Sequence, residues 1–170
     1  MEIRFANEKD LAGINSLLYQ VLEVHHKGRP DLFYSGVKKY TDDEVLAILK
    51  NDQTPVFVAV EDEKVLGYAF CIFTEVKGSH ILKDVKSLYL DDLCVDEASR
   101  GKHVGKALYE KVLAFAKENA IDYAVVAPDD PLVLGCVDRL NEVGIPCFGP
   151  TARAAIIEGS KAFSKNLMKK

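Results

Sequence analysis

The order of the predicted elements indicates an α/β fold of the α+β type, a mixed sheet flanked by helices. Three observations support this class. Two β-rich runs, 55–60 and 64–73, are joined by the charged turn "EDE", which predicts an antiparallel hairpin. The loop "SRGKHVG" joins a predicted strand to a predicted helix. The continuous apolar run "IDYAVVAP" (121–128) is typical of a strand buried in a parallel sheet.

The first predicted element is an amphipathic helix over residues 8–24. Asn7 can cap its first turn, and Asp10 is the acidic partner at the third helical position. The apolar side chains that follow recur at helical spacing: Leu11, Ile14, Leu18 and Val21. A glycine and a proline then interrupt the pattern, so residues 25–36 are predicted to form a substantial loop.

A second helix, a third strand and a third helix follow. Thr41 and Glu44 form a capping box for a helix that runs to about Lys50. The run "SLYLDDLCV" (87–95) predicts the strand that comes after the hairpin. Residues 103–118 predict a helix whose apolar face comprises Val104, Leu108, Val112 and Phe115.

The last third of the sequence predicts a β-α-β-α unit. After the strand at 121–128, a helix runs from Pro131 to Val143, with one apolar side made of Leu132, Val133, Cys136, Val137 and Leu140. A right-handed crossover then brings the short strand "IPCFG" (145–149) beside the first strand in parallel. The remainder is helical in pattern, with a restart at Ser160.

Composition and charge exclude several classes of protein. The 170 residues suit one domain, and 48% hydrophobic with 28% charged residues is typical of a globular protein. A net charge of −4 argues against a nucleic-acid partner. The N-terminus lacks the layout of a signal peptide and no apolar run is long enough for a membrane span, so we expect a cytoplasmic protein without a membrane partner. The four cysteines form no CxxC pair, which favours buried free thiols over a metal site or disulfides.

The loop at residues 99–107 has the features of an anion-binding site. The first turn of the following helix carries unpaired N–H groups and a partial positive charge. Gly101 and Gly105 would let a ligand approach the backbone, while Arg100 and Lys102 add positive charge. A pyrophosphate suits this loop. An unoccupied turn with incidental glycines explains the loop alone equally well, and its spacing is neither a Walker A motif nor G-x-G-x-x-G.

The segment "YLDDLCVDEASRGKHVGKALYEKVLAFAK" resembles the coenzyme A motif of the GNAT superfamily of N-acetyltransferases. The family signature, Arg/Gln-x-x-Gly-x-Gly/Ala, corresponds to Arg100, Gly101, Lys102, His103, Val104 and Gly105, with His103 in place of the first signature glycine. The resemblance covers residues 1–118 and implies an acyl-CoA N-acyltransferase fold that uses acetyl-CoA. It also implies that the pantetheine meets the backbone of Leu93, Cys94 and Val95, and that the pyrophosphate meets the amides from Gly101 to Lys106.

The same resemblance implies a direct attack by a neutral amine, which requires a base for the ammonium proton. Asp91 and Asp92 are the candidates. Because side chains alternate along a strand, we expect only one of them to reach the acceptor. Polyamine acetyltransferases of the superfamily carry a glutamate at the first position, which favours Asp91. Alternatively, both carboxylates bind a cationic acceptor or lie in solvent.

The loop after the first helix matches the place where the family lines its acceptor site. The polar residues there are His25, His26, Arg29 and Asp31. A plain surface loop explains them almost as well.

Residues 115–170 resemble a different family, phosphoribosylamine–glycine ligase. The segments "APDDPLVLGCVDRLNEVGIPCFGPT" and "EGSKAFSKNLM" carry this resemblance. The ATP-grasp domain and the opening glycine-rich motif of the ligase are absent, so we expect no ligase activity. Leu140 falls where acetyltransferases commonly place the tyrosine that protonates the leaving thiolate, and leucine cannot donate a proton.

The sequence therefore predicts a chimera, an acetyltransferase-like part at 1–118 and a ligase-like part at 119–170. We expect the strand at 121–128 to pair with the strand at 87–95, so that residues 1–170 form a single composite domain. Exchange of the strand or terminal helix between two chains would give a homodimer. Three functions remain open: an N-acetyltransferase acting on a small-molecule or peptide amine, a coenzyme A-binding protein with little turnover, and a recombinant without function.

Overall fold

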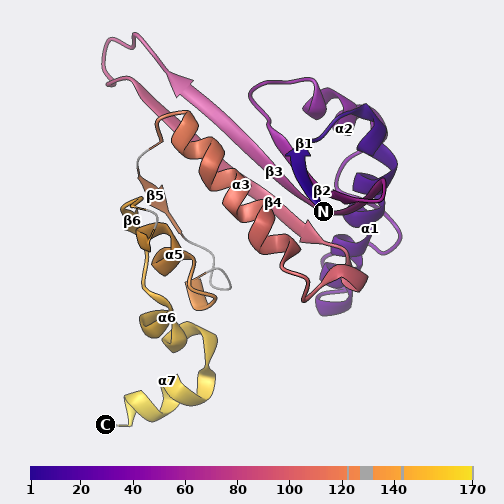
Figure 1. Ribbon diagram of the computed structural model, residues 1–170. Coiled ribbons are helices and arrows are strands. Elements are labelled where there is room, and N and C mark those ends of the chain that lie inside the picture. The colour runs from indigo at the N-terminus through magenta and orange to yellow at the C-terminus, as the bar shows by residue number, and fades with distance from the viewer. Residues whose placement is uncertain (122, 127–131, 143, 170) are drawn as a thin grey trace. The chain divides into compact units, whose positions relative to one another are not determined.

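The computed structural model describes residues 1–121, 123–126, 132–142 and 144–169 (Figure 1). The chain divides into two compact units, Met1–Ala120 and Ile121–Lys170, which are described separately. The division falls within two residues of the boundary expected from the two resemblances. Within the described residues, no helix is both long enough and apolar enough to cross a bilayer.

The first unit begins with a strand that the sequence did not predict. This strand, β1 (Glu2–Phe5), precedes the short 3-10 helix η1 (Glu8–Asp10), α1 (Leu11–Gly28) and α2 (Asp42–Leu49). Both predicted capping boxes are confirmed, at Asn7 with Asp10 and at Thr41 with Glu44. The four residues of β1 are exposed or partly buried. A strand with so little burial has no strong apolar pattern by which the sequence could indicate it.

Four strands form an antiparallel sheet in the order β1-β2-β3-β4. The hairpin β2 (Val56–Glu61) and β3 (Lys64–Val76) confirms the predicted pairing. The strand β4 (Val85–Val95) pairs with β3 on one side and is the last strand of this sheet. A second 3-10 helix, η2 (Glu97–Ser99), then leads into α3 (Val104–Glu118).

Helices cover both faces of this sheet (Figure 1). On one face, α1 and α2 enclose a core that includes Leu17, Val45, Val58 and Tyr68. On the other, α3 contributes Val104, Leu108 and Val112 to a second core, and Phe115 packs against it, as its apolar spacing predicts. These two cores fix the position of β4 and of the turn that follows it.

The second unit contains β5 (Ala124–Val125), α5 (Cys136–Glu142), β6 (Cys147–Phe148), α6 (Ala152–Gly159) and α7 (Lys161–Met168). The strands β5 and β6 are parallel, which confirms the predicted arrangement of these two strands. Ser160 caps α7 by accepting a hydrogen bond from the amide of Phe163, which confirms the predicted restart. The remaining positions of the predicted strand (122, 127 and 128) and both ends of the predicted helix (131 and 143) lie outside the described residues.

One expectation for β5 was wrong. The apolar run was expected to be buried on both faces, but Tyr123 and Val125 are 54% and 66% exposed. Within the described residues, β5 pairs with β6 in a two-stranded parallel sheet. Val126 is the buried hydrophobic residue of the described part of the run. The expected pairing of this run with the strand at 87–95 stays a prediction. The union of both units into a single composite domain stays a prediction.

Candidate functional site

An irregularity in β4 determines where the two candidate acids point. The register between β3 and β4 shifts between Phe70, which faces Asp92, and Cys71, which faces Leu90. Asp91 is therefore the extra residue of a β-bulge. Leu90 and Leu93 both pack on the α3 face, three positions apart instead of two.

The bulge corrects the expectation that Asp91 and Asp92 lie on opposite faces. Both carboxylates contact side chains on the face that α1 and α2 cover. Asp91 Oδ2 accepts a hydrogen bond from Tyr40 Oη at 3.3 Å, and Asp92 Oδ2 accepts one from Tyr68 Oη at 3.0 Å. Tyr40 and Tyr68 both belong to the α1–α2 side of the sheet. Strict alternation failed because one extra residue in the strand returns the second side chain to the same face.

The two carboxylates differ in their electrostatic surroundings. Asp91 forms an ion pair with Lys39, with 2.8 Å between Nζ and Oδ2. Asp92 has no ion-pair partner among the described residues. Burial raises the pKa of Asp92, and the hydrogen bond from Tyr68 and the charges of Lys39 and His25 only partly offset this effect. A half-buried carboxyl with a raised pKa is a typical candidate for a general base.

The loop after β4 has two residues with left-handed backbone conformations before the N-terminus of α3. Gly101 has φ +80°, a conformation that suits glycine. His103 occupies the N-cap of α3 in the left-handed region, with φ 60° and ψ 18°, at the position where the family signature has glycine. Both residues are exposed. The first-turn amides of α3 follow directly, and such amides have no partner inside their own helix.

The edge of β4 is the second part of the predicted coenzyme site. The amide of Asp96 donates to the carbonyl of Leu66 on β3 at 2.8 Å. Because backbone groups alternate along a strand, Cys94 also directs its N–H and C=O toward β3. The backbone groups of Leu93 and Val95 therefore point away from β3. Of the three residues predicted to meet the pantetheine, these two have backbone groups at the free edge, defined as the side of β4 that no strand among the described residues pairs with. Those of Cys94 face β3.

Gly105 controls how closely α3 approaches this edge. A Cβ at Gly105 would lie 3.4 Å from Val95 Cγ2 and 3.8 Å from Leu93 Cδ2. These are ordinary contacts, which explains why the signature allows alanine at this position. A longer side chain would have to extend beside the helix N-terminus.

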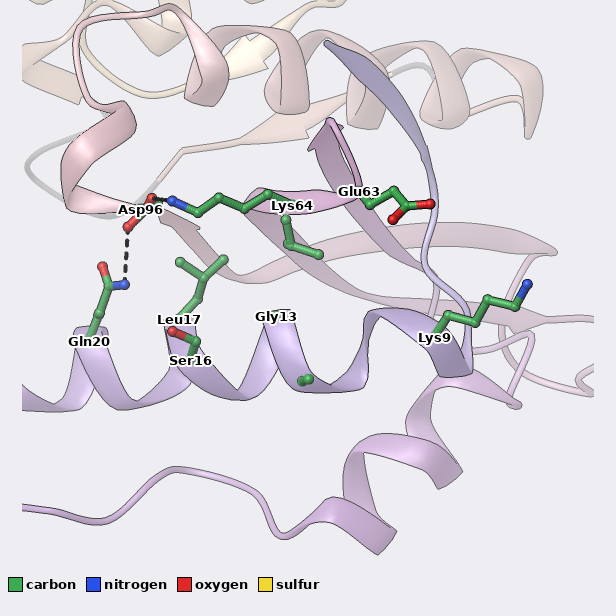
Figure 2. A pocket seen from close by; sticks show the side chains of 10 residues that line it. Lys9, Gly13, Ser16, Leu17, Gln20, Glu63, Lys64 and Asp96 are labelled. Carbon is green, nitrogen blue, oxygen red and sulfur yellow. Dashed lines mark hydrogen bonds and ion pairs between the residues drawn. The ribbon is translucent and has the colours of Figure 1, made fainter.

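Asp96 anchors the loop to the rest of the unit, a role that was not predicted from the sequence. Figure 2 shows Lys64 and Gln20 reaching Asp96 from β3 and α1, at 2.8 and 3.1 Å. The carboxylate also accepts a longer hydrogen bond, 3.5 Å, from Ser99 in η2. The hydrogen bond from Lys64 lowers the pKa of Asp96 despite its burial. A carboxylate directly after a strand is the signal that could have suggested an anchor.

A pocket of about 410 Å³ lies beside this anchor, between α1 and the turn that joins β2 to β3 (Figure 2). Small residues of α1, Ala12, Gly13 and Ser16, form part of its wall. None of the site residues expected from the sequence lines it. The pocket shares Asp96 with the anchor of the loop, but neither Asp91, Asp92 nor the glycines of the loop line it.

The predicted acceptor loop is only partly directed toward the carboxylates. His25 stacks on Phe33, with 5.1 Å between ring centroids, and its charge contributes to the electrostatics of Asp92. Arg29 instead forms a two-pronged ion pair with Asp31, at 2.9 and 2.7 Å, and both side chains are more than half exposed. The structure thus relates His25 to the site and pairs Arg29 with Asp31 at the surface.

The thiols are consistent with a structural role. Cys71 and Cys94 are buried, Cys136 and Cys147 are partly buried, and none of these four described cysteines forms a disulfide. Burial raises the pKa of Cys94 to about 11, so this thiol stays protonated near neutral pH. Protonated thiols are poor nucleophiles, as expected for an apolar strand position.

Sequence comparison relates part of the chain to phosphoribosylamine–glycine ligases. The family model "Phosphoribosylglycinamide synthetase, N domain" matches residues 71–158, just over half of the 170 residues. A phosphoribosylamine–glycine ligase from Vibrio parahaemolyticus is 54% identical over 57 residues, 34% of this chain and 13% of the ligase. The ligase from Halalkalibacterium halodurans is 51% identical over 61 residues, 36% of this chain and 14% of the ligase. The chain thus spans about one seventh of the length of these curated relatives.

Structural comparison relates the chain to acetyltransferases. A mutant of the BH1408 protein from Bacillus halodurans has a TM-score of 0.68 at 26% identity, over 89% of this chain and 96% of that one. An acetyltransferase from Vibrio fischeri has a TM-score of 0.59 at 26% identity, over 71% and 90%. A ribosomal-protein-alanine N-acetyltransferase from Brucella melitensis shares the fold, with a TM-score of 0.51 at 21% identity, over 72% and 70%.

The two sets of relatives lead to one conclusion. The ligases match only about a third of the chain, whereas the acetyltransferase structure from Vibrio fischeri covers 71% of it. The chain belongs to the phosphoribosylglycinamide synthetase N-domain family over residues 71–158, and as a whole it is a chimera that joins a GNAT acetyltransferase fold to a ligase-like segment.

Proposed function

We propose that the protein is an acetyl-CoA-dependent N-acetyltransferase that transfers an acetyl group to a primary amine of a small molecule or peptide. The observation that carries the proposal is the continuity of the site. The free edge of β4, the left-handed Gly101 and the N-terminus of α3 follow one another within residues 93–106. A strand edge suits the amides of pantetheine, and a helix N-terminus suits a pyrophosphate.

The residues present fit coenzyme A. The backbone groups of Leu93 and Val95 would hold the pantetheine, and the amides from Gly101 to Lys106 would hold the pyrophosphate. Gly105 keeps the helix N-terminus free of a bulky side chain. Acetyl-CoA, when bound, supplies the acetyl group as a thioester.

We propose Asp92 as the residue that accepts the proton of the acceptor ammonium. The sequence favoured Asp91, but Asp91 is committed to the ammonium of Lys39. Asp92 has a raised pKa, so near neutral pH it is a stronger base than an ordinary aspartate. Tyr68 is fully buried, and its hydroxyl donates to Asp92, which keeps the carboxylate in place.

Thermal denaturation with acetyl-CoA tests the proposal. A ligand at a hundredfold excess over its Kd stabilises the native state by about 2.7 kcal/mol. Gly105→Asp should remove this stabilisation, because it places a carboxylate beside the helix N-terminus. Gly28→Asp is the matched control, since no atom lies within 4 Å of a Cβ there. An unchanged melting temperature of the parent protein in millimolar acetyl-CoA would show that the proposal is wrong.

A second candidate function is coenzyme A binding with little or no turnover. Leu140, which falls where acetyltransferases commonly have a tyrosine acid, is buried in α5 and has no proton to donate. Release of free thiol from acetyl-CoA over a panel of amines separates the two candidates. Turnover supports the transferase, whereas binding without thiol release supports the second function.

A further inference from the structure

Lys39 places a primary ammonium on the face of β4 where the acceptor is expected to bind. Its Nζ lies 2.8 Å from Asp91 Oδ2 and 5.0 Å from the centre of the Tyr40 ring. Tyr40 donates to the same carboxylate oxygen and stacks on Phe70 of β3, with 5.9 Å between ring centroids. A carboxylate and an aromatic face are the groups that bind alkylammonium ions in proteins.

The segment that carries Lys39 is attached to the helices on both sides. Before Lys39, Glu23 of α1 accepts hydrogen bonds from Ser35 Oγ at 2.9 Å and from the amide of Gly36 at 2.7 Å. Next to it, Lys38 donates to Asn15 Oδ1 at 2.7 Å and pairs with Asp42. The fold therefore holds the Lys39 backbone beside Asp91.

As a result, the two carboxylates on this face differ in how far their charges are neutralised. The carboxylate pair, defined as Asp91 and Asp92, carries two negative charges when ionised, and Lys39 neutralises one of them. A cationic acceptor would find Asp92 free and Asp91 occupied. A second ammonium on the same acceptor would be repelled by the ammonium of Lys39, because like charges repel at short range.

We propose that Lys39 is a specificity-determining residue that restricts the acceptor to amines with a single positive charge near the reacting end. This inference rests on the proposed function, because it concerns the acceptor side of the same site. In the parent protein, Lys39 takes the place that a second ammonium would occupy. Removing its charge frees Asp91 to bind that second ammonium.

Binding of two probe amines tests the proposal. Butylamine and diaminobutane differ in the second ammonium, and their Kd values can be measured by NMR titration with coenzyme A present. In Lys39→Met we expect the preference for diaminobutane over butylamine to rise about three- to fivefold, the scale of one partly exposed ion pair. Lys50→Met is the matched control, since Lys50 pairs with Glu8 instead. Adding Asp91→Asn to Lys39→Met should remove the gain.

The inference is overturned if folded Lys39→Met keeps the parent preference, or if Lys50→Met shows the same gain. Lys39→Gln replaces Lys39→Met if the latter has a lowered melting temperature. Failure of the proposed function is recognised separately, because acetyl-CoA would then leave the melting temperature of the parent protein unchanged. The ratio of amine Kd values in the absence of coenzyme A still decides the role of Lys39 in that case.

Discussion

Asp92 and Asp96 are four positions apart, but ionisation affects their contribution to stability in opposite directions. Burial raises the pKa of Asp92, whereas the hydrogen bond from Lys64 is the main cause that lowers the pKa of Asp96. The native state therefore binds a proton at Asp92 more tightly than the unfolded chain does, and at Asp96 less tightly. This contrast agrees with the proposed role of Asp92 as a base and with the ion pair and hydrogen bonds that Asp96 makes.

Asp92→Asn should stabilise the protein near neutral pH and reduce its activity. Because the folded pKa is raised, the cost of ionising Asp92 grows as the pH rises through that pKa and is absent below about pH 4. Asparagine avoids this cost and still accepts from Tyr68. Turnover should fall by about a hundredfold or more if Asp92 is the base. Urea unfolding at two pH values and thiol release measure both effects; unchanged turnover would contradict the assignment.

Asp96→Asn provides the opposite case. A lowered folded pKa contributes stability above the unfolded pKa that is lost as the pH falls through the folded pKa. We expect the free energy of unfolding to fall by about 1–3 kcal/mol near pH 7. The reason is that a neutral amide replaces the buried carboxylate that accepts hydrogen bonds from Lys64 and Gln20. The loss should shrink in acid. A stability gain at neutral pH would show that the contacts from Lys64 and Gln20 do not stabilise the loop.

His103 shows how a departure from the family signature affects the coenzyme loop. The left-handed backbone of His103 costs a non-glycine residue about 1–3 kcal/mol. Glycine would avoid this cost, but it would also raise the conformational entropy of the unfolded chain, which offsets part of the gain. His103→Gly should therefore raise the free energy of unfolding by up to about 1 kcal/mol. His103→Val should lower it, because β-branched residues disfavour this conformation. If His103→Gly and His103→Val change the free energy of chemical unfolding equally, the left-handed conformation assigned to His103 is wrong.

At the scale of elements, the sequence predicted what depends on nearby residues. Both capping boxes and the apolar face of α3 lie within a few positions along the chain and were confirmed. The bulge at Asp91 was not predictable, because it exists only in the register of β4 against β3. The contact of Lys39 with Asp91 joins residues 52 positions apart, so no local pattern indicates it.

The packing of α3 on β3 depends on Gly67. A Cβ there would lie 2.8 Å from the carbonyl oxygen of Cys94, 3.0 Å from Leu108 Cδ1 and 3.2 Å from Val104 Cγ1. Gly67→Ala should destabilise the protein by about 1–3 kcal/mol, because a backbone atom must move. Gly28→Ala is the control, with open space around its Cβ and a helical position that favours alanine. Similar values in urea unfolding would contradict this account of the interface.

At the scale of the whole molecule, the sequence predicted the chimera and the parallel pairing of the two strands in the ligase-like segment, but not the exposure of the first of these strands. The boundary near residue 118 stays a prediction. The strand β5 pairs with β6, and its Val125 is exposed. Its apolar pattern is that of a strand buried on both faces, a pattern that does not specify which neighbours supply the burial. Exchange of this strand or of the terminal helix between two chains stays a prediction. Light scattering of the purified protein tests it by measuring whether the protein is a dimer.

The single composite domain is tested by limited proteolysis near Asn119, at the end of α3. If both units fold cooperatively, this site should resist cleavage about as long as the rest of the chain does. Rapid cutting that leaves a stable fragment of residues 1–118 would show that the two parts fold independently.

Hydrogen exchange with and without saturating acetyl-CoA tests the central claim most directly, that residues 93–106 form the coenzyme site. We expect slower exchange in peptides that cover the edge of β4, the loop at Gly101 and the first turn of α3. Peptides from α1 that line the separate pocket should be unchanged and serve as the internal control. No protection at residues 93–106, or protection confined to α1, would contradict the account.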